Sequence, residues 1–202
     1  MSGNYAHKIS AHFAASKPER KIVLAAGEKF RLIPYDVSFS ESLFEAVDES
    51  RGELVRWTPW CSVEYTMEDS RRWLQSRELC RFQGRAYDFA VTDATTGELV
   101  GGCGIERIER ENRVGKLYYW VRSARRREGA ASEAAHAVAS FGFKSLQLIR
   151  LEALVSEGNF LGQRVAEKIG ASREIRLRSR LILNGTIHHA YLFALFPQAE
   201  QD

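Results

Sequence analysis

Residues 118–135 read YYWVRSARRREGAASEAA, and this stretch decides the fold. It contains the end of an apolar run (residues 114–121), a short arginine-rich loop and an alanine-rich segment typical of a helix. This order indicates a buried strand whose end leads directly into the N-terminus of a helix. Helix N-termini expose unpaired N–H groups and a partial positive charge, which favour a bound phosphate. The stretch therefore predicts an anion site within an α/β fold.

The junction between loop and helix has the composition of a pyrophosphate site. Small side chains let a ligand approach the backbone closely at Gly129, Ala130 and Ala131. Positive charges and a hydroxyl donor come from Arg122, Arg125, Arg126, Arg127 and Ser132. The spacing matches neither a Walker A loop nor a dinucleotide-binding GxGxxG motif. Clustered arginines are also typical of a solvated turn, and the strand–loop–helix context favours the phosphate interpretation.

The elements before this stretch begin with a short strand at Phe30–Pro34. Ser38 or Ser40 is predicted to cap a helix whose apolar face carries Leu43, Phe44 and Val47. A Trp/Pro-rich connector at residues 57–60 follows. Thr66 and Asp69 then form a capping-box pattern that predicts a second helix holding Trp73 and Leu74. Residues 1–27 are weakly patterned, so we expect an N-terminal extension there and the domain itself at 28–198.

The sheet is predicted mainly from the elements around the opening stretch. Residues 86–92 and 99–108 form strands joined by a turn at 93–97, and residues 150–155 form another strand after a helix at 129–146. A further helix begins near Asn159, with a stripe of Leu161, Val165 and Ile169, and ends at Gly170. Asn184-Gly185 predicts a tight hairpin. The order indicates an α/β fold with a mixed sheet.

The overall composition excludes several classes of protein. The chain has 202 residues and a formal charge of +3, which suits one globular domain and is too small to indicate nucleic-acid binding. No apolar run approaches the about 20 residues that span a bilayer. The N-terminus lacks an apolar segment of signal-peptide length. We therefore expect a cytoplasmic protein with no membrane partner.

The cysteines argue against a disulfide framework and against a metal site. Cys61, Cys80 and Cys103 are odd in number and show no CxxC or Cys/His ligand spacing. A reducing compartment is the simplest interpretation of this pattern. We expect no metal cofactor.

The opening stretch resembles the acetyl-CoA loop of the GNAT superfamily, whose pattern is Gln/Arg-x-x-Gly-x-Gly/Ala. Arg126, Gly129 and Ala131 meet that pattern. The Trp57-Thr-Pro-Trp60 segment and Tyr119-Trp120 resemble the Rim-type branch, the ribosomal-protein N-terminal acetyltransferases. The helix from Asn159 and the Asn184-Gly185 hairpin extend the similarity over residues 30–196.

The resemblance implies a mostly antiparallel sheet, flanked by helices and splayed between two central strands that end near Val121 and Val155. Acetyl-CoA would lie in this V, and its contacts would come from Tyr119, Trp120, Val121, Arg126, Arg127, Glu128, Gly129, Ala130, Ala131, Ser132, Asn159, Arg164 and Lys168. Asn159 is equally a plausible helix cap. Arg164 and Lys168 are equally a solvated helix face.

The resemblance also implies a backbone oxyanion donor near Trp120 or Val121. Three positions that handle protons in relatives carry other residues here: Gly162 in place of serine, Ala166 in place of tyrosine and Leu181 in place of glutamate. The candidate catalytic residues are therefore Asn159, Tyr118 and Glu106. Strand solvation for Glu106 and core packing for Tyr118 remain alternatives.

The acceptor site is predicted from aromatic and histidine side chains. Trp57, Trp60 and His188 are the candidate substrate-binding residues, although tryptophans often pack in cores. His188 and His189 are adjacent on a strand and so point to opposite faces. An α-amino group has a pKa of about 8 and is partly neutral at pH 7, so it suits a site without a strong base.

These features predict an N-acetyltransferase that moves an acetyl group from acetyl-CoA to a primary amine, with a protein N-terminal α-amine as the first candidate. A small-molecule amine (an antibiotic, a peptide toxin or a metabolite) and a catalytically weak acyl-CoA sensor are alternatives. A basic RNA-binding module is a further class, but the loop lacks interleaved aromatic residues. The resemblance also implies a possible homodimer.

Overall fold

The computed structural model describes residues 22–197, which fold around one sheet of eight strands in the order β1-β2-β3-β4-β5-β6-β8-β7. The strands are β1 (Leu24–Ala26), β2 (Phe30–Pro34), β3 (Tyr87–Asp93), β4 (Leu99–Glu109), β5 (Val114–Val121), β6 (Arg150–Ser156), β7 (Ser172–Leu183) and β8 (Thr186–Leu195). Neighbouring strands are antiparallel except β5 and β6. The predicted α/β class and mixed sheet are confirmed.

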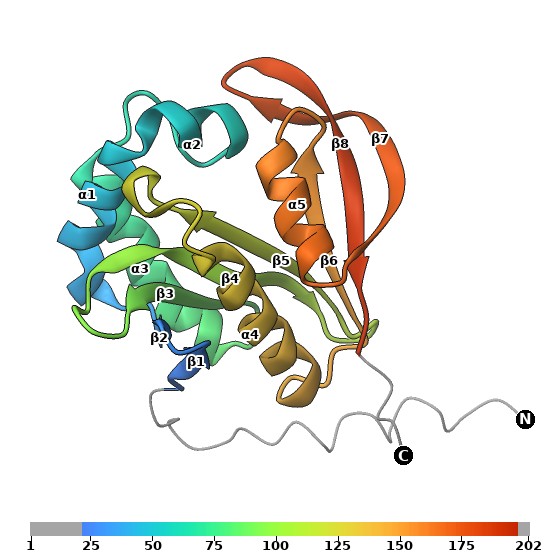
Figure 1. Cartoon of the computed structure of the whole chain (residues 1–202), viewed down its shortest axis with the longest axis horizontal. Helices are drawn as coiled ribbons and strands as arrows, with labels where there is room; N and C mark the ends of the chain where they lie inside the picture. Colours follow the sequence, from blue (N-terminus) through green and yellow to red (C-terminus); the bar gives the residue numbers. More distant parts are fainter. Residues whose placement is uncertain (1–21, 198–202) are drawn as a thin grey trace, which may run out of the picture.

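Helices cover both faces of the sheet (Figure 1). One layer consists of α1 (Ser40–Glu49), α2 (Arg51–Trp57) and α3 (Met67–Phe82), and the opposite face carries α4 (Ala130–Lys144) and α5 (Phe160–Lys168). Two hydrophobic cores result, one on each face. On β5 the side chains alternate between them, since Leu117 and Tyr119 pack into the α4 core and Tyr118 and Trp120 into the α1–α3 core.

The sheet opens between its central strands. β5 and β6 pair only at their first residues, Val114–Lys116 with Arg150–Glu152. Beyond these positions the two strands diverge, while β5 remains paired with β4 as far as Val121 and β6 remains paired with β8 as far as Ser156. One edge of β5 is therefore left without a strand partner, and the predicted splay is confirmed.

Two local signals in the sequence are confirmed by the structure. Thr66 and Asp69 form the capping box of α3: the Thr66 side chain accepts from the Asp69 N–H, and the Asp69 carboxylate accepts from the Thr66 N–H. Asn184 and Gly185 have φ values of 46° and 75° and connect β7 to β8. These left-handed values suit a two-residue hairpin turn.

Other expectations need correction. Neither Ser38 nor Ser40 caps α1, because Asp36 caps a 3-10 turn (Val37–Phe39) that runs directly into the helix. The sequence also gave no sign of α2, and β1 lies inside the stretch assigned to the extension. On α5, Leu161 is 46% exposed because Gln163 and Ala166 form the buried face instead. Residues 1–21 of the expected extension lie outside the described residues.

The α3 capping box gives a stability prediction. Thr66→Ala removes the hydroxyl that satisfies the Asp69 N–H, and we expect the free energy of unfolding to fall by about 1 kcal/mol. Urea denaturation measures the change. Thr95→Ala, in an exposed turn, is the matched control and should change stability by no more than about 0.5 kcal/mol. Equal effects of the two changes would show that the cap contributes nothing.

Candidate active site

The loop from β5 to α4 presents an uncapped helix N-terminus. Gly129 is the N-cap residue, with φ of 92° and no side chain to satisfy the first N–H groups of α4. Arg127 also has a left-handed backbone, with φ of 68°, which is unfavourable for a non-glycine residue. Ala130 is buried beneath the loop, and the buried Ser132 hydroxyl donates to the Gly129 carbonyl oxygen at 2.9 Å. The N–H groups of the first turn are therefore the donors available to an anion.

The four arginines of this loop divide into two pairs. Arg122 donates to Glu49 at 2.9 Å and to Glu98 at 2.8 Å, and its side chain is 16% exposed. Arg125 binds Asp93 and Glu98, each at 2.7 Å. The Arg125 hydrogen bonds hold the pKa of Asp93 well below its usual range. Arg122 and Arg125 therefore hold the loop against neighbouring segments, and their charges are already compensated.

Arg126 and Arg127 carry the positive charge that remains at the surface. Both are exposed, and Arg126 only approaches Glu53, at 3.6 Å. Glu128 does not bind an anion, because it is itself a carboxylate. It accepts hydrogen bonds from Arg125, and these lower its pKa. Two kinds of predicted pyrophosphate contact therefore remain available to a phosphate: the backbone N–H groups at residues 129–131 and the guanidinium groups of the two exposed arginines.

A cleft of about 460 Å³ lies where β5 and β6 diverge. Its walls come from both strands, from α3, from the start of α5 and from the connector after α2. The lining includes the predicted catalytic residues Glu106, Tyr118 and Asn159 and the predicted substrate-binding residues Trp57 and Trp60. It also includes Tyr119 and Trp120, which were predicted as cofactor contacts, and Gly162. His188 is not among the lining residues. It is half-buried on β8 opposite Leu181, and the neighbouring His189 accepts a hydrogen bond from the Ser179 N–H at 2.9 Å.

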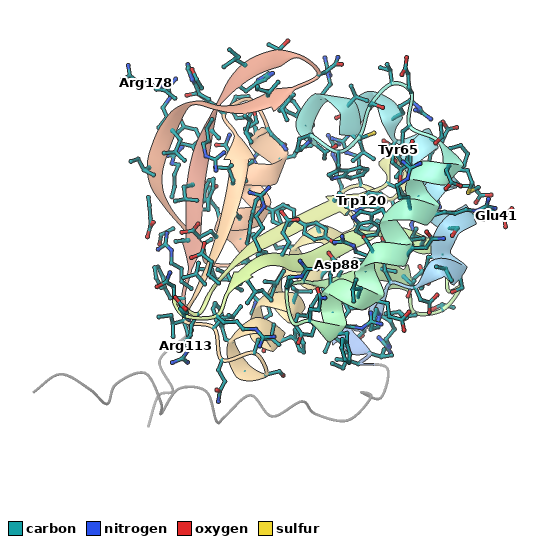
Figure 2. The ribbon with its side chains drawn as sticks, turned by 180° about the vertical axis from the view of Figure 1, so that it is seen from behind. Glu41, Tyr65, Asp88, Arg113, Trp120 and Arg178 are labelled. Atoms are coloured by element: carbon teal, nitrogen blue, oxygen red, sulfur yellow. The ribbon has the colours of Figure 1, made fainter. Side chains whose placement is uncertain are left out.

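Aromatic rings cross β4 on the floor of this cleft because β4 has glycines beneath them. Asp88, Gly104 and Tyr118 lie in register on β3, β4 and β5. A Cβ at Gly104 would lie 2.8 Å from the Tyr118 ring and 2.6 Å from the Tyr87 carbonyl oxygen. Gly102 provides the same space beneath Trp120, whose indole nitrogen would lie 2.5 Å from an added Cβ. Figure 2 shows Asp88 and Trp120 in the middle of the sheet.

Tyr118 reaches a buried carboxylate across Gly104. Its hydroxyl donates to Asp88 Oδ1 at 2.9 Å, while Arg77 from α3 binds Asp88 Oδ2 at 3.3 Å. Asp88 is 3% exposed, and its burial raises the pKa of the carboxyl group. Burial, and then the Asp88 charge, raise the pKa of Tyr118 well above its ordinary value. Two residue rows away along β4 and β5, Glu106 pairs with Lys116 at 3.1 Å.

The sequence reasoning missed Asp88 and Arg77. A signal for Asp88 was present, because YDFAVTD places an ionisable residue inside an otherwise apolar strand pattern. Buried carboxylates are uncommon and normally have a charged or hydrogen-bonding partner. No comparable signal marks Arg77, which lies among other charged residues on α3. Its role depends on the packing of α3 against β3, which a single sequence does not specify.

The structure places Gly162, Ala166 and Leu181, the three positions at which the resemblance implies a missing proton-handling side chain. Ala166 is completely buried in the α4-side core, and Leu181 is opposite His188 on the β7–β8 ladder. The N–H of Gly162 donates to the Asn159 side chain at 2.9 Å, so Asn159 does cap α5. A Cβ at Gly162 would lie 3.0 Å from Val155 Cγ1, which leaves little room for serine.

Two further cofactor candidates lie outside the cleft. Arg164 and Lys168 are both exposed on α5. Lys168 lines a second, more open hollow of about 770 Å³ between β1, α4 and the end of α5. Tyr119 connects the two sides of the splay, because its hydroxyl on β5 donates to the Gly162 carbonyl oxygen on α5 at 2.7 Å.

Across residues 22–197, no helix is both long and apolar enough to cross a bilayer. The same part of the chain contains no group of three or more His, Cys, Asp or Glu side chains arranged to hold a metal ion. Cys61, Cys80 and Cys103 are free thiols.

Comparison with known proteins identifies relatives of this chain. A family model described as an acetyltransferase (GNAT) domain matches residues 31–172. An N-acetyltransferase of Bacillus licheniformis, p20, whose activity is uncharacterised, is 28% identical over 141 residues, which cover 70% of this chain and 77% of the relative.

Solved structures share the fold at lower sequence identity. The ribosomal L7/L12 α-N-protein acetyltransferase RimL in complex with coenzyme A has a TM-score of 0.83 and 19% identity, covering 89% of this chain and 100% of RimL. The microcin C7 self-immunity acetyltransferase MccE, solved with acetyl-CoA and AMP, has a TM-score of 0.78 and 14% identity, covering 85% of this chain and 94% of MccE. At these identities the similarity establishes the fold alone.

Proposed function

Because this chain belongs to the GNAT acetyltransferase family, we propose that it moves the acetyl group of acetyl-CoA onto the N-terminal α-amine of a protein. One observation carries the proposal. The uncapped N-terminus of α4 and the aromatic cleft both adjoin the diverging ends of β5 and β6. An anion site and an acceptor site thus lie on either side of an open strand edge.

The donor side of the site suits the chemistry of coenzyme A. Its pyrophosphate needs several N–H donors and positive charge, which the first turn of α4, Arg126 and Arg127 supply. Its extended amide-containing arm needs backbone partners, and the edge of β5 beyond Lys116 has no strand partner on the β6 side. We assign the acetyl-CoA contacts to these groups, with Asn159 near the reactive end of the cleft.

The acceptor side suits an amine that binds in the cleft between its aromatic side chains. The amine nitrogen attacks the thioester carbonyl carbon, and the resulting oxyanion requires a preorganised donor. Successive N–H groups of a strand point to opposite edges, and the Arg122 N–H donates to the Val100 carbonyl oxygen on the β4 side. The backbone N–H of Val121, on the open edge of β5, is therefore our candidate for that donor. An α-amine is partly neutral near pH 7, whereas a lysine amine costs about 5 kcal/mol to deprotonate at that pH. The site is therefore better matched to an α-amine than to a lysine side chain.

A protein N-terminus is our first candidate because the structurally similar RimL acts on such an amine. A small-molecule amine is the second, supported by the aromatic lining of the cleft: Trp57, Trp60, Tyr65, Trp73, Tyr118 and Trp120. Flat rings of this kind suit an aromatic or heterocyclic acceptor. MccE, which was solved with AMP as well as acetyl-CoA, has the same fold.

Acetyl transfer to defined acceptors tests the proposal. The full-length protein is incubated with radiolabelled acetyl-CoA and either ribosomal proteins, synthetic peptides with free or blocked N-termini, or a panel of small amines. We expect label on the free α-amine, located by mass spectrometry, and none on blocked peptides. Label on small amines alone would contradict the protein acceptor. Acetyl-CoA binding without transfer to any amine would indicate a sensor instead of an enzyme.

A further inference from the structure

The acceptor ammonium must lose a proton before it attacks, and three acidic side chains line the cleft: Asp69, Asp88 and Glu106. One of these groups can accept that proton, provided that the chain transfers acetyl groups to amines as proposed above. We propose that Tyr118 and Asp88 form this proton-accepting pair, with Tyr118 in contact with the amine and Asp88 holding the proton.

The geometry of the pair supports a relay. Tyr118 lines the cleft, and its hydroxyl hydrogen already points to Asp88 Oδ1 at 2.9 Å. The hydroxyl oxygen therefore has lone pairs free to accept a hydrogen bond from an ammonium in the cleft. A proton then passes from the ammonium nitrogen to the Tyr118 oxygen as the Tyr118 proton passes to Asp88. The balanced result is a neutral amine, a neutral tyrosine and a protonated Asp88.

The rest of the reaction balances without a further base. The neutral amine forms a bond to the thioester carbon, the carbon–sulfur bond breaks, and the second nitrogen proton passes to the departing thiolate, which leaves as the free thiol of coenzyme A. Asp88 returns its proton to water before the next turnover. Tyr118 is not the final proton acceptor at any stage, because its hydroxyl stays protonated far above neutral pH. Asp88 is suited to hold the proton, because its burial disfavours the charged carboxylate.

Other acidic groups in the cleft are already engaged. Asp69 forms the capping box of α3 with Thr66, and Glu106 is paired with Lys116 at 3.1 Å. The charged or titratable groups that face Asp88 are Arg77 from α3, Tyr118 from β5, Glu106 and Cys103 from β4, and Tyr35 after β2. Arg77 opposes the effect of burial, because its contact at 3.3 Å lowers the pKa of the Asp88 carboxyl group. The remaining four add no positive charge.

The contact between Tyr118 and Asp88 depends on the absence of a side chain at Gly104. Any side chain at that position would separate the Tyr118 ring from Asp88, since an added Cβ would lie 2.8 Å from Tyr118 Cε1 and 3.0 Å from Asp88 Cα. A simple packing role for Tyr118 would not require a buried carboxylate at the end of its ring. Tyr118 is therefore assigned as a catalytic residue and Asp88 as the positioning residue that receives the proton through it.

The kinetic test compares Asp88→Asn and Tyr118→Phe with wild type in the full-length protein. We expect kcat/KM with an α-amine peptide to fall about 10-fold at pH 7 in each variant, because about a tenth of an amine with a pKa of about 8 is already neutral at that pH. The loss should shrink as pH rises toward the pKa of the amine, because the acceptor then deprotonates without help. A peptide with an aminooxy group at its N-terminus, which is neutral at pH 7, should be acetylated by both variants at near wild-type rates.

Control measurements separate this role from a structural one. Asp48→Asn, an exposed carboxylate on α1, should leave the rate unchanged, and all variants should keep their affinity for acetyl-CoA. A loss of rate in Asp88→Asn that is equal at every pH and for both peptides would overturn the proposal. So would a Glu106→Gln variant that alone removed the acidic limb of the pH profile.

A second measurement needs no acceptor and so separates this proposal from the proposed function. NMR of the aspartate carboxyl carbons, with the Asp88 signal identified by its absence in Asp88→Asn, follows the titration directly. We expect a midpoint above the ordinary value of about 3.9, and Tyr118→Phe should shift it upward because a hydrogen bond to the carboxylate is lost. A midpoint at or below the ordinary value, unaffected by Tyr118→Phe, would contradict the pair even if acetyl transfer is observed.

Discussion

The double variant Arg126→Glu/Arg127→Glu is expected to bind acetyl-CoA at least about 100-fold more weakly than wild type, since each charge-assisted hydrogen bond contributes about 1.5–3 kcal/mol. These are the two loop arginines whose charges remain exposed, while Arg122 and Arg125 are engaged by carboxylates. Reversal also places two negative charges beside the phosphate site. Isothermal titration calorimetry with acetyl-CoA measures the change.

Arg178→Glu/Arg180→Glu is the matched control. It changes the net charge by the same amount at exposed positions on β7, an edge strand of the sheet. Figure 2 shows Arg178 at a corner of the molecule, away from Asp88 and Trp120 at the centre of the sheet. We expect this control to keep wild-type affinity within about 3-fold, because the Debye length at physiological salt is about 8 Å. Similar losses in the two double variants would mean that the loop does not bind the phosphates specifically.

Gly104→Ala is expected to lower the free energy of unfolding by about 3 kcal/mol, at the upper end of the usual cost of overpacking. The added Cβ meets the Tyr87 carbonyl oxygen at 2.6 Å and the Tyr118 ring at 2.8 Å. The backbone atom cannot move without disturbing the β3–β4 ladder, and the ring cannot move without leaving Asp88. Urea denaturation measures the loss, and acetyl transfer should fall with it.

Gly52→Ala is the control for this substitution and has the opposite expected sign. Gly52 lies in α2 with nothing within 4 Å of an added Cβ. Alanine should therefore stabilise the protein by about 0.5–1 kcal/mol through its helix propensity. If Gly104→Ala were tolerated as well as Gly52→Ala, the close approach of Tyr118 to β4 would be wrong.

The parts of the fold that sequence predicted were those with a local physical cause. The Asn184-Gly185 turn, the capping box at Thr66 and the strand–loop–helix at residues 118–135 each depend on a few neighbouring residues. The cap of α1 was misplaced because three serines and Asp36 offer competing oxygen acceptors within a few residues. On α5, Val165 and Ile169 do pack against the core, but Leu161 was misjudged. Gln163 takes an inward position instead and donates to the carbonyl oxygens of Ser156 and Glu157.

The candidate site was predictable only in part for a related reason. Loop composition located the anion site, but not which arginines were free, since Arg122 and Arg125 find their carboxylates in Glu49, Asp93 and Glu98. These partners lie 24 to 73 residues away in sequence. The Asp88–Tyr118 contact likewise depends on the register of three strands. Long-range pairing of this kind leaves no signature in a single sequence.

The most direct test of the account is a crystal structure of the full chain with coenzyme A. We predict the pyrophosphate within hydrogen-bonding distance of the backbone N–H groups at the start of α4, and the pantetheine arm along the open edge of β5. The sulfur should face the cleft that contains Tyr118. Coenzyme A bound instead in the hollow between β1, α4 and Lys168, with the Arg126–Arg127 loop free of phosphate, would contradict the account.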